Sequence, residues 1–231
     1  VNFDDNPSSE GFANQDGNTA QELYNDDIFV GYRYYDTFGV DVSYPFGYGG
    51  SYTSFAMSTK SVKADKDKVT VQVKVKNTGT VSGKEVAEVY FSAPDGELDK
   101  PYQELAGYAK TDELAPGESQ ILTISFDTKE MGSYDTDKAA YVMEDGDYII
   151  RVGNSSRNTH VAAKLNVAED TITEQYSNLM VPVTENDNIE NSDKYPTLEP
   201  MTTEGATSIT YDGEANEIAA AKTIEVDFTG Y

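Results

Sequence analysis

The side chains best suited to binding are concentrated in a tyrosine-rich stretch near the N-terminal end. Tyr32-Arg33-Tyr34-Tyr35-Asp36 places a guanidinium and a carboxylate among three phenols, and Phe46 and Tyr48 follow in a glycine-rich run. Aromatic faces stack on pyranose rings, but they also pack domain contacts in which tyrosine hydroxyls find hydrogen-bond partners. We expect the packing role here.

Arg33 is the single basic residue among nine acids in residues 1–50, so a carboxylate partner is expected for it. Arg33 and Asp36 have two possible roles: they are substrate ligands, or they form a structural ion pair or bonds to loop backbone. We favour the structural role.

Other polar groups offer weaker signals. Glu144, Asp145 and Asp147 lack the ligand spacing of a calcium loop and predict a hairpin turn instead. His160 is expected at the surface near the last strand. Asn154-Ser155-Ser156 is a glycosylation sequon, relevant only if the source glycosylates its proteins.

The composition excludes several function classes. The 231 residues contain no cysteine and one histidine, so no thiolate nucleophile, cysteine zinc site or multi-histidine metal site can form. The net charge of -24 disfavours nucleic acid and anionic membrane partners. We assign no metal and no cofactor. Localisation is left open between cytoplasmic and secreted, with a bacterial source expected, and the non-Met start suggests a fragment or a processed chain.

The negative charge is unevenly distributed. Residues 51–168 hold 18 acids and 14 bases, whereas 1–50 are net -8 and 169–231 are net -12. The middle therefore resembles an ordinary protein surface. The acidic tail is either a solvated linker, which we favour, or a partner-binding arm.

The middle of the chain has the pattern of an all-β domain. Residues 68–76 alternate polar residues with Val69, Val71, Val73 and Val75, which places the valines on one buried face. Further strands are predicted at 52–58, 86–91, near 102–108, and at 119–126, 139–143, 148–152 and 160–167. Seven or eight short strands in about 115 residues indicate an immunoglobulin-like β-sandwich. A small closed barrel is the alternative.

The flanks are predicted to be irregular. Residues 1–23 are interpreted as loop, and 169–205 are expected to be extended or mobile because they carry many acids and few large apolar residues. Residues 217–222 favour a helix, and 223–228 alternate like a short strand.

Two long motifs resemble glycoside hydrolase family 3 β-glucosidases. The first is Tyr24 to Asp36, followed by Tyr44-Pro45-Phe46-Gly47-Tyr48-Gly49 and Ser51-Tyr52-Thr53. The second set is typical of the family's fibronectin type III-like domain and includes Val75–Gly79, Gly83–Val86, Leu114–Glu118 and Gly146–Tyr148. Two positions depart from the family pattern: Gly50 replaces leucine, which removes a buried anchor if that site is packed, and Asp27 replaces glycine.

The resemblance implies three segments: the C-terminal edge of an α/β-sandwich domain at 1–50, a fibronectin type III-like sandwich at 51–168, and an acidic linker at 169–231. The linker would lead to a barrel domain in a rearranged subgroup of the family. Family enzymes are retaining β-glycosidases that use an Asp nucleophile and a Glu acid/base. Neither catalytic motif matches a position here, so we assign no catalytic residue.

The predicted function is therefore a non-catalytic structural region of a family 3 β-glucosidase. Its predicted partners are the remaining catalytic domains, the barrel and the α/β sandwich, with carbohydrate contact as a further option. The alternatives are a stand-alone carbohydrate- or protein-binding module, or a subunit that completes an enzyme in trans. Tyr32, Arg33, Tyr34, Tyr35, Asp36, Phe46 and Tyr48 are the candidate interdomain residues.

Overall fold

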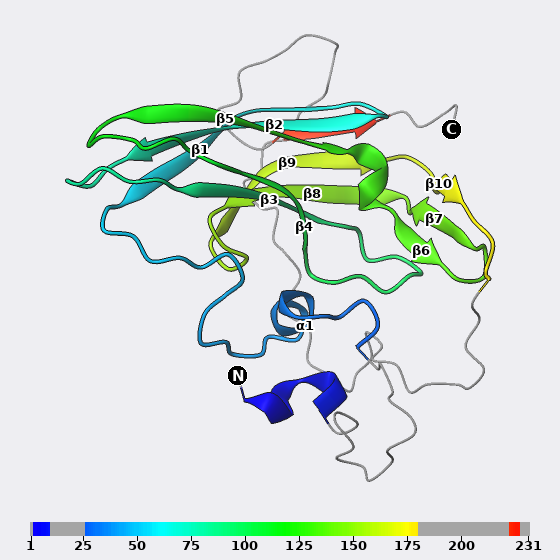
Figure 1. Ribbon diagram of the computed structural model, residues 1–231. Helices are drawn as coiled ribbons and strands as arrows, with labels where there is room; N and C mark the ends of the chain where they lie inside the picture. Colours follow the sequence, from blue (N-terminus) through cyan, green and yellow to red (C-terminus); the bar gives the residue numbers. More distant parts are fainter. Residues whose placement is uncertain (1, 10–25, 180–221, 227–231) are drawn as a thin grey trace.

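A computed structural model describes residues 2–9, 26–179 and 222–226 of the chain, and the described part is dominated by strands (Figure 1). Two sheets face each other, and a third, smaller sheet extends from one end. A short helix and loops lie below the sandwich in this view. No helix in the described ranges is long and apolar enough to cross a bilayer.

The first sheet consists of β1 (Phe55–Ala64), β2 (Lys68–Asn77) and β5 (Ser119–Asp127), all antiparallel, with β2 in the centre. The predicted alternation in β2 is confirmed, because Val69, Val71, Val73 and Val75 are completely buried. Burying each valine side chain contributes about 1.5–3 kcal/mol.

The second sheet has the order β11-β9-β8-β3-β4. Its strands are β3 (Val86–Ser92), β4 (Glu104–Lys110), β8 (Gly146–Gly153), β9 (Thr159–Val167) and β11 (Lys222–Val226). β11 pairs in parallel with β9, whereas the other neighbours are antiparallel. The short strand predicted at 223–228 therefore corresponds to β11, but the predicted helical stretch lies almost wholly outside the described residues.

The two sheets enclose the main core. Val71 and Ile124 from the first sheet pack in one cluster with Val89, Ile150 and Leu165 from the second. Because two separate sheets meet face to face, the predicted β-sandwich is confirmed and the closed-barrel alternative is wrong.

A third sheet consists of β6 (Ser133–Asp135), β7 (Ala140–Met143) and β10 (Thr171–Gln175), in the order β10-β7-β6. A 3-10 turn, Thr128–Met131, precedes it. β10 lies in the segment that was expected to be an irregular acidic linker, so paired strand structure continues beyond residue 168.

The predicted hairpin across residues 144–147 is wrong. β7 pairs with β6 and β10, whereas β8 pairs with β3 and β9, so the chain crosses between sheets at this point. The reason is Glu144, whose buried carboxylate forms an ion pair with buried Lys100 and accepts the backbone N–H of Glu97 at 2.6 Å. Glu144 therefore anchors the loop after β3 instead of occupying an exposed turn.

Within the described residues 2–9 and 26–53, the N-terminal part has little regular structure. It contains two 3-10 turns, Phe3–Asp5 and Pro7–Ser9, and the helix α1 (Tyr32–Thr37). Phe29, Tyr34 and Phe38 form a small second core beside α1, with Phe29 and Phe38 ring centroids 5.0 Å apart. Most of the predicted loop at 1–23 lies outside the described residues.

A candidate interdomain surface

α1 is held against the sandwich by its own polar side chains. Gly31 precedes the helix with a φ of 61°, a conformation that suits glycine. Thr37 accepts the backbone N–H of Tyr102 at 2.8 Å, and the Tyr32 hydroxyl accepts the backbone N–H of Leu105, also at 2.8 Å. Both donors lie in or just before β4, so the helix caps that edge of the second sheet.

Arg33 and Asp36 do not pair with each other. Arg33 Nη1 lies 3.3 Å from Glu104 Oε2, a pair that is about one-third exposed. Burial raises the pKa of Glu104, and the positive charge of Arg33 opposes this shift. Both Arg33 and Asp36 therefore form structural contacts, but their partners come from the sandwich.

Asp36 is the centre of a buried polar cluster. Its side chain is 4% exposed, and its Oδ1 lies 2.7 Å from Arg157 Nε. Arg157 also donates to the carbonyls of Tyr35 and Val40, at 3.1 and 2.6 Å. Gln103 donates to Asp36 and to the carbonyl of Ser156. One guanidinium from the β8–β9 turn thus fixes both the helix and the loop that follows it.

The aromatic rings divide into buried and exposed groups. Tyr32 stacks on Phe46 with centroids 4.8 Å apart and meets buried Tyr90 edge-on at 6.1 Å. Tyr34 packs against Phe38 at 5.0 Å, and the Tyr35 hydroxyl donates to Asn6. These contacts provide the expected packing and the expected hydroxyl partners.

A buried carboxylate lies beneath the glycine-rich loop. Glu88 on β3 is 6% exposed and accepts a hydrogen bond from the Tyr90 hydroxyl at 2.7 Å. Burial raises the pKa of Glu88, and the Tyr90 bond opposes this shift. Gly47 has a φ of 81°, and a Cβ there would lie 2.7 Å from the Glu88 Cδ. Position 47 therefore requires glycine for both conformation and space.

A second anchor joins this loop to the sandwich. The Asn77 side chain is completely buried and donates to the carbonyls of Val81 and Leu114, each at 2.8 Å. Its Oδ1 accepts from the Thr53 hydroxyl at 2.8 Å and from the Gly79 N–H at 3.0 Å. Asn77, the last residue of β2, is thus a fully bonded link between this strand and residue 53.

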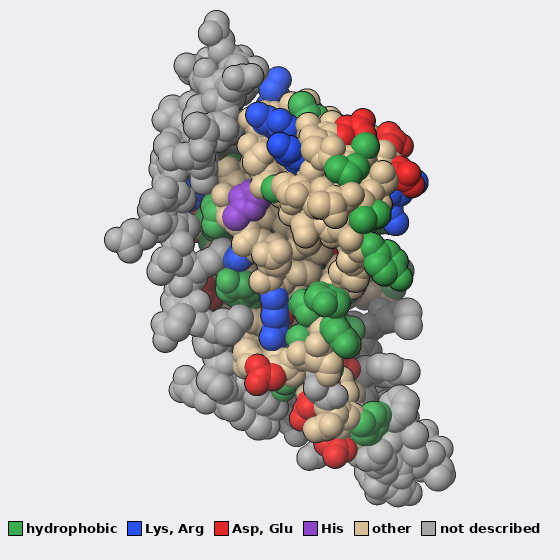
Figure 2. Space-filling view, turned by 90° about the vertical axis from the view of Figure 1, so that its left-hand side faces the viewer, with side chains coloured by type: hydrophobic (Ala, Val, Ile, Leu, Met, Phe, Trp, Pro, Cys, Tyr) green, Lys and Arg blue, Asp and Glu red, His purple; other side chains and the backbone are tan. Residues whose placement is uncertain are grey.

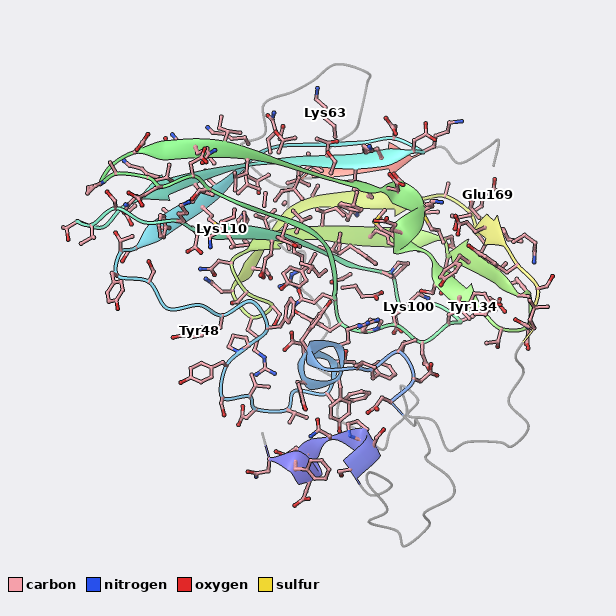
Figure 3. The ribbon with its side chains drawn as sticks, viewed as in Figure 1. Tyr48, Lys63, Lys100, Lys110, Tyr134 and Glu169 are labelled. Carbon is pink, nitrogen blue, oxygen red and sulfur yellow. The ribbon has the colours of Figure 1, made fainter. Side chains whose placement is uncertain are left out.

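The outer side of the same loop is exposed and aromatic. The exposed fractions are 70% for Tyr44, 46% for Phe46, 59% for Tyr48 and 98% for Tyr52. A pocket of about 370 Å³ lies between α1 and residues 42–46, and its lining includes Tyr32, Tyr35, Asp36, Val42, Tyr44 and Phe46. Figure 3 labels Tyr48 on this part of the molecule, below the sandwich. We call Tyr44, Phe46, Tyr48 and Tyr52 the aromatic rim.

The two departures from the family pattern have structural counterparts. Gly50 is exposed, and a Cβ there would meet no atom within 4 Å, so a side chain at this position would not be packed by the described residues. Asp27 adopts a φ of 47°, the left-handed conformation in which glycine carries no penalty.

His160 lies on the exposed face of β9, as expected. It is the purple side chain in Figure 2, where hydrophobic side chains gather to the right of it and below it. Its Nε2 is 3.1 Å from the Thr59 hydroxyl, and partial burial together with Arg151 lowers its pKa. A polar pocket of about 190 Å³ adjoins it.

Sequence reasoning missed the sandwich partners of α1. Gln103 and Glu104 lie in the strand predicted near 102–108, but nothing in the local sequence indicated that they contact the helix. Arg157 stands in a polar turn and had no signal. Within the described ranges, no group of three His, Cys, Asp or Glu side chains could hold a metal ion.

The fold and a family model agree on the class of domain. Residues 85–156 match the model of the fibronectin type III-like domain, and this stretch runs from the start of β3 to the β8–β9 turn. The chain therefore contains a fibronectin type III-like β-sandwich.

Sequence similarity to known proteins extends beyond that domain. The chain is 42% identical over 186 residues to a β-glucosidase of Ruminococcus albus, covering 78% of this chain and 19% of the relative. It is 40% identical over 203 residues to β-glucosidase A of Butyrivibrio fibrisolvens, covering 78% and 24%.

Solved structures of β-glucosidases also match most of this chain. The β-glucosidase of Paenibacillus barengoltzii matches with a TM-score of 0.71 and 44% identity, covering 76% of this chain and 20% of that one. The family 3 β-glucosidase of Bifidobacterium adolescentis matches with a TM-score of 0.65 and 31% identity, covering 80% and 26%. The resemblance to part of the family 3 β-glucosidases is confirmed, and the chain spans about a fifth to a quarter of the length of these relatives.

Proposed function

We propose that the chain is a non-catalytic structural region of a family 3 β-glucosidase, in which the aromatic rim docks onto a catalytic domain. The observation that carries this proposal is the two-sided character of residues 26–53. Their inner side is fixed to the sandwich by the Asp36–Arg157 pair and by Tyr32, whereas their outer side exposes four large aromatic side chains. An exposed aromatic patch next to a rigid support is typical of an interaction site.

The surroundings of Gly50 fit this role. Gly50 leaves open space beside the rim, where a partner domain would fill the volume that the sandwich does not. The catalytic Asp and Glu of the family would then lie on the partner domains, and the activity of the assembled protein would be the hydrolysis of terminal β-glycosides with retention.

Reconstitution tests the proposal. The 231-residue chain is mixed with a separately produced polypeptide encoded by the neighbouring parts of its reading frame, and hydrolysis of 4-nitrophenyl β-glucoside is followed. We expect no hydrolysis by the chain alone and recovery of activity in the mixture. Hydrolysis by the chain alone would contradict the assignment of no catalytic residue.

Rim variants identify the docking surface. Tyr48→Ala and Tyr44→Ala should raise the concentration of chain needed for half-maximal activity by about tenfold each, because buried interface aromatics carry much of the binding energy. Tyr108→Ala is the matched control, since Tyr108 is 70% exposed but lies on β4, outside the rim. Equal effects of all three substitutions would contradict docking through the rim.

A binding module is the second candidate. The pocket among Tyr32, Tyr35 and Tyr44 favours it, because aromatic side chains make up much of its lining. In that case the isolated chain would bind cellobiose in calorimetry, and Tyr44→Ala would abolish the heat of binding.

A further inference from the structure

Three tyrosines lie together on the exposed face of the third sheet. Tyr134 on β6 is directly opposite Tyr141 on β7, and their ring centroids are 5.3 Å apart. Tyr176 follows β10 and lies 5.9 Å from Tyr141. The three side chains are 36%, 39% and 51% exposed. We call them the tyrosine row.

Polar side chains lie around the edges of this row. The Tyr176 hydroxyl donates to Glu174 Oε2 at 2.7 Å, and the Tyr134 hydroxyl donates to Asn178 Oδ1 at 2.5 Å. Glu174 is directly opposite Tyr141 in the β10–β7 register and pairs with Lys129. The rings are thereby held in place, and a carboxylate, an amide and an ammonium group lie at their edges.

The other face of this sheet is part of the protein interior. Ala140 and Val142, which alternate with Tyr141 along β7, are 0% and 2% exposed, and Met143 at the end of β7 belongs to the main core. The sheet is therefore rigidly attached to the sandwich, although it projects from one end of it (Figure 1). The three side chains of the tyrosine row do not belong to the core.

The tyrosine row is separate from the aromatic rim. Tyr134 and Tyr48 lie at opposite sides of the molecule in Figure 3. The rim belongs to the loop after α1, whereas the row belongs to β6, β7 and the end of β10. A ligand on the row would leave the rim accessible for a domain contact, so this surface is not part of the proposed docking site.

We propose that the tyrosine row binds a neutral polysaccharide chain. Aromatic faces present an apolar surface to the C–H groups of a pyranose ring, while charged and amide groups beside them can bond its hydroxyls. The centre of a protein–protein interface is instead depleted of charged residues. The charged side chains of Glu174 and Lys129 lie beside the tyrosine row, so the row does not have this composition.

The net charge of the chain favours a neutral polysaccharide over an acidic one. Its net charge is -24, so an acidic polysaccharide would be repelled, whereas a neutral one would not. The inference goes beyond the proposed structural function, because it assigns a ligand to a surface that the catalytic domains would not use.

Affinity electrophoresis of the 231-residue chain tests this inference. Native gels contain either a soluble mixed-linkage β-glucan or galactomannan, two neutral polymers. We expect retardation in at least one of them. Tyr141→Ala should weaken the binding by about tenfold, because it removes the central ring of the row and with it an apolar surface for the C–H groups of a pyranose ring. Tyr141→Phe should bind like the wild type, since it keeps the ring.

Matched measurements separate binding from folding. Tyr108→Ala, which removes an exposed tyrosine of β4, should keep full retardation, and thermal melts should confirm that each variant is folded. Absence of retardation in both polymers would overturn the proposal, as would equal retardation of Tyr141→Ala and the wild type. Self-association that Tyr141→Ala abolishes, without retardation, would assign the row to a protein contact instead. Reconstituted β-glucosidase activity does not depend on this outcome.

Discussion

At the scale of single residues, charge pairing across the chain decides where the N-terminal segment lies. Arg33 and Asp36 are three positions apart, but each pairs with a sandwich residue, Glu104 or Arg157. The two pairs differ in burial: the first is about one-third exposed on both sides, whereas Asp36 is almost fully buried. A buried carboxylate left without its partner is far more costly than an exposed one.

Removal of Arg157 should therefore have a large effect. In Arg157→Ala, Asp36 keeps its burial but loses its cation, and the Tyr35 and Val40 carbonyls lose their donor. We expect the free energy of unfolding to fall by about 2–4 kcal/mol. Urea denaturation measures it. Arg33→Ala, which breaks the exposed pair, is the control and should cost about 0–1 kcal/mol. Similar losses in both variants would contradict the assigned difference.

Glu88 should make stability dependent on pH. The pKa of Glu88 in the folded state is raised above the ordinary value of 4.5, so the folded chain binds the proton more tightly than the unfolded chain does. The resulting stabilisation is fully present below pH 4.5. This stabilisation is lost as the pH rises through the raised pKa. In Glu88→Gln the amide oxygen still accepts the Tyr90 hydrogen bond, but no proton is released.

The thermal midpoints of the wild type and Glu88→Gln, compared from pH 4 to pH 8, test this. We expect the midpoint of the variant to rise relative to that of the wild type with increasing pH. A difference that stays constant over this range would show that Glu88 has the same pKa in the folded and unfolded states.

At the scale of elements, strands with strict alternation were predictable, because their burial pattern follows from period two alone. β2 is the clear case: four valines at alternate positions are all completely buried. The β7–β8 connection was not predictable from local signals. Residues 144–147 have the composition of a turn, but the Glu144–Lys100 pair across the fold outweighs that preference.

The glycine-rich loop supplies an element-scale prediction. Gly47→Ala introduces a Cβ against the Glu88 carboxylate at a backbone φ of 81°. We expect a loss of about 1–3 kcal/mol in the free energy of unfolding, since strain and a steric clash act together. Chemical denaturation measures the loss. Gly49→Ala is the control: a Cβ there meets no atom within 4 Å, so its effect should be below about 1 kcal/mol. A Gly47→Ala chain as stable as the control would show that the loop moves freely away from Glu88.

At the scale of the whole molecule, the sequence indicated the sandwich but could not identify the surfaces it leaves uncovered. The tyrosines of the N-terminal stretch stood out because Tyr32, Tyr34 and Tyr35 lie within four residues of one another. Tyr134, Tyr141 and Tyr176 are spread over 43 positions, and only the pairing of β6, β7 and β10 brings them together. Long-range strand register therefore limits what spacing along a chain can reveal about a binding surface.

The parallel strand β11 provides the whole-molecule prediction. It pairs with β9, whose other side is occupied by β8, and it also contacts β1. The main core is built from residues 62–167, so a chain that ends at residue 179 should still fold. Its β9 edge would then present unpaired backbone N–H and C=O groups, which promote strand-to-strand association. We expect light scattering to show concentration-dependent dimers of the shortened chain.

A chain that ends at Val226 keeps β11 and is the matched control, which should remain monomeric. Charge must be separated from the edge effect, because residues 180–231 contain 11 acids and 2 bases, and their removal also reduces repulsion between copies. In 1 M salt the Debye length is about 3 Å, so repulsion between surface charges is screened in both chains. If the difference in association persists there, the exposed β9 edge causes it. If it disappears, the acidic segment keeps the chains apart by charge, and β11 is not needed to protect the sheet.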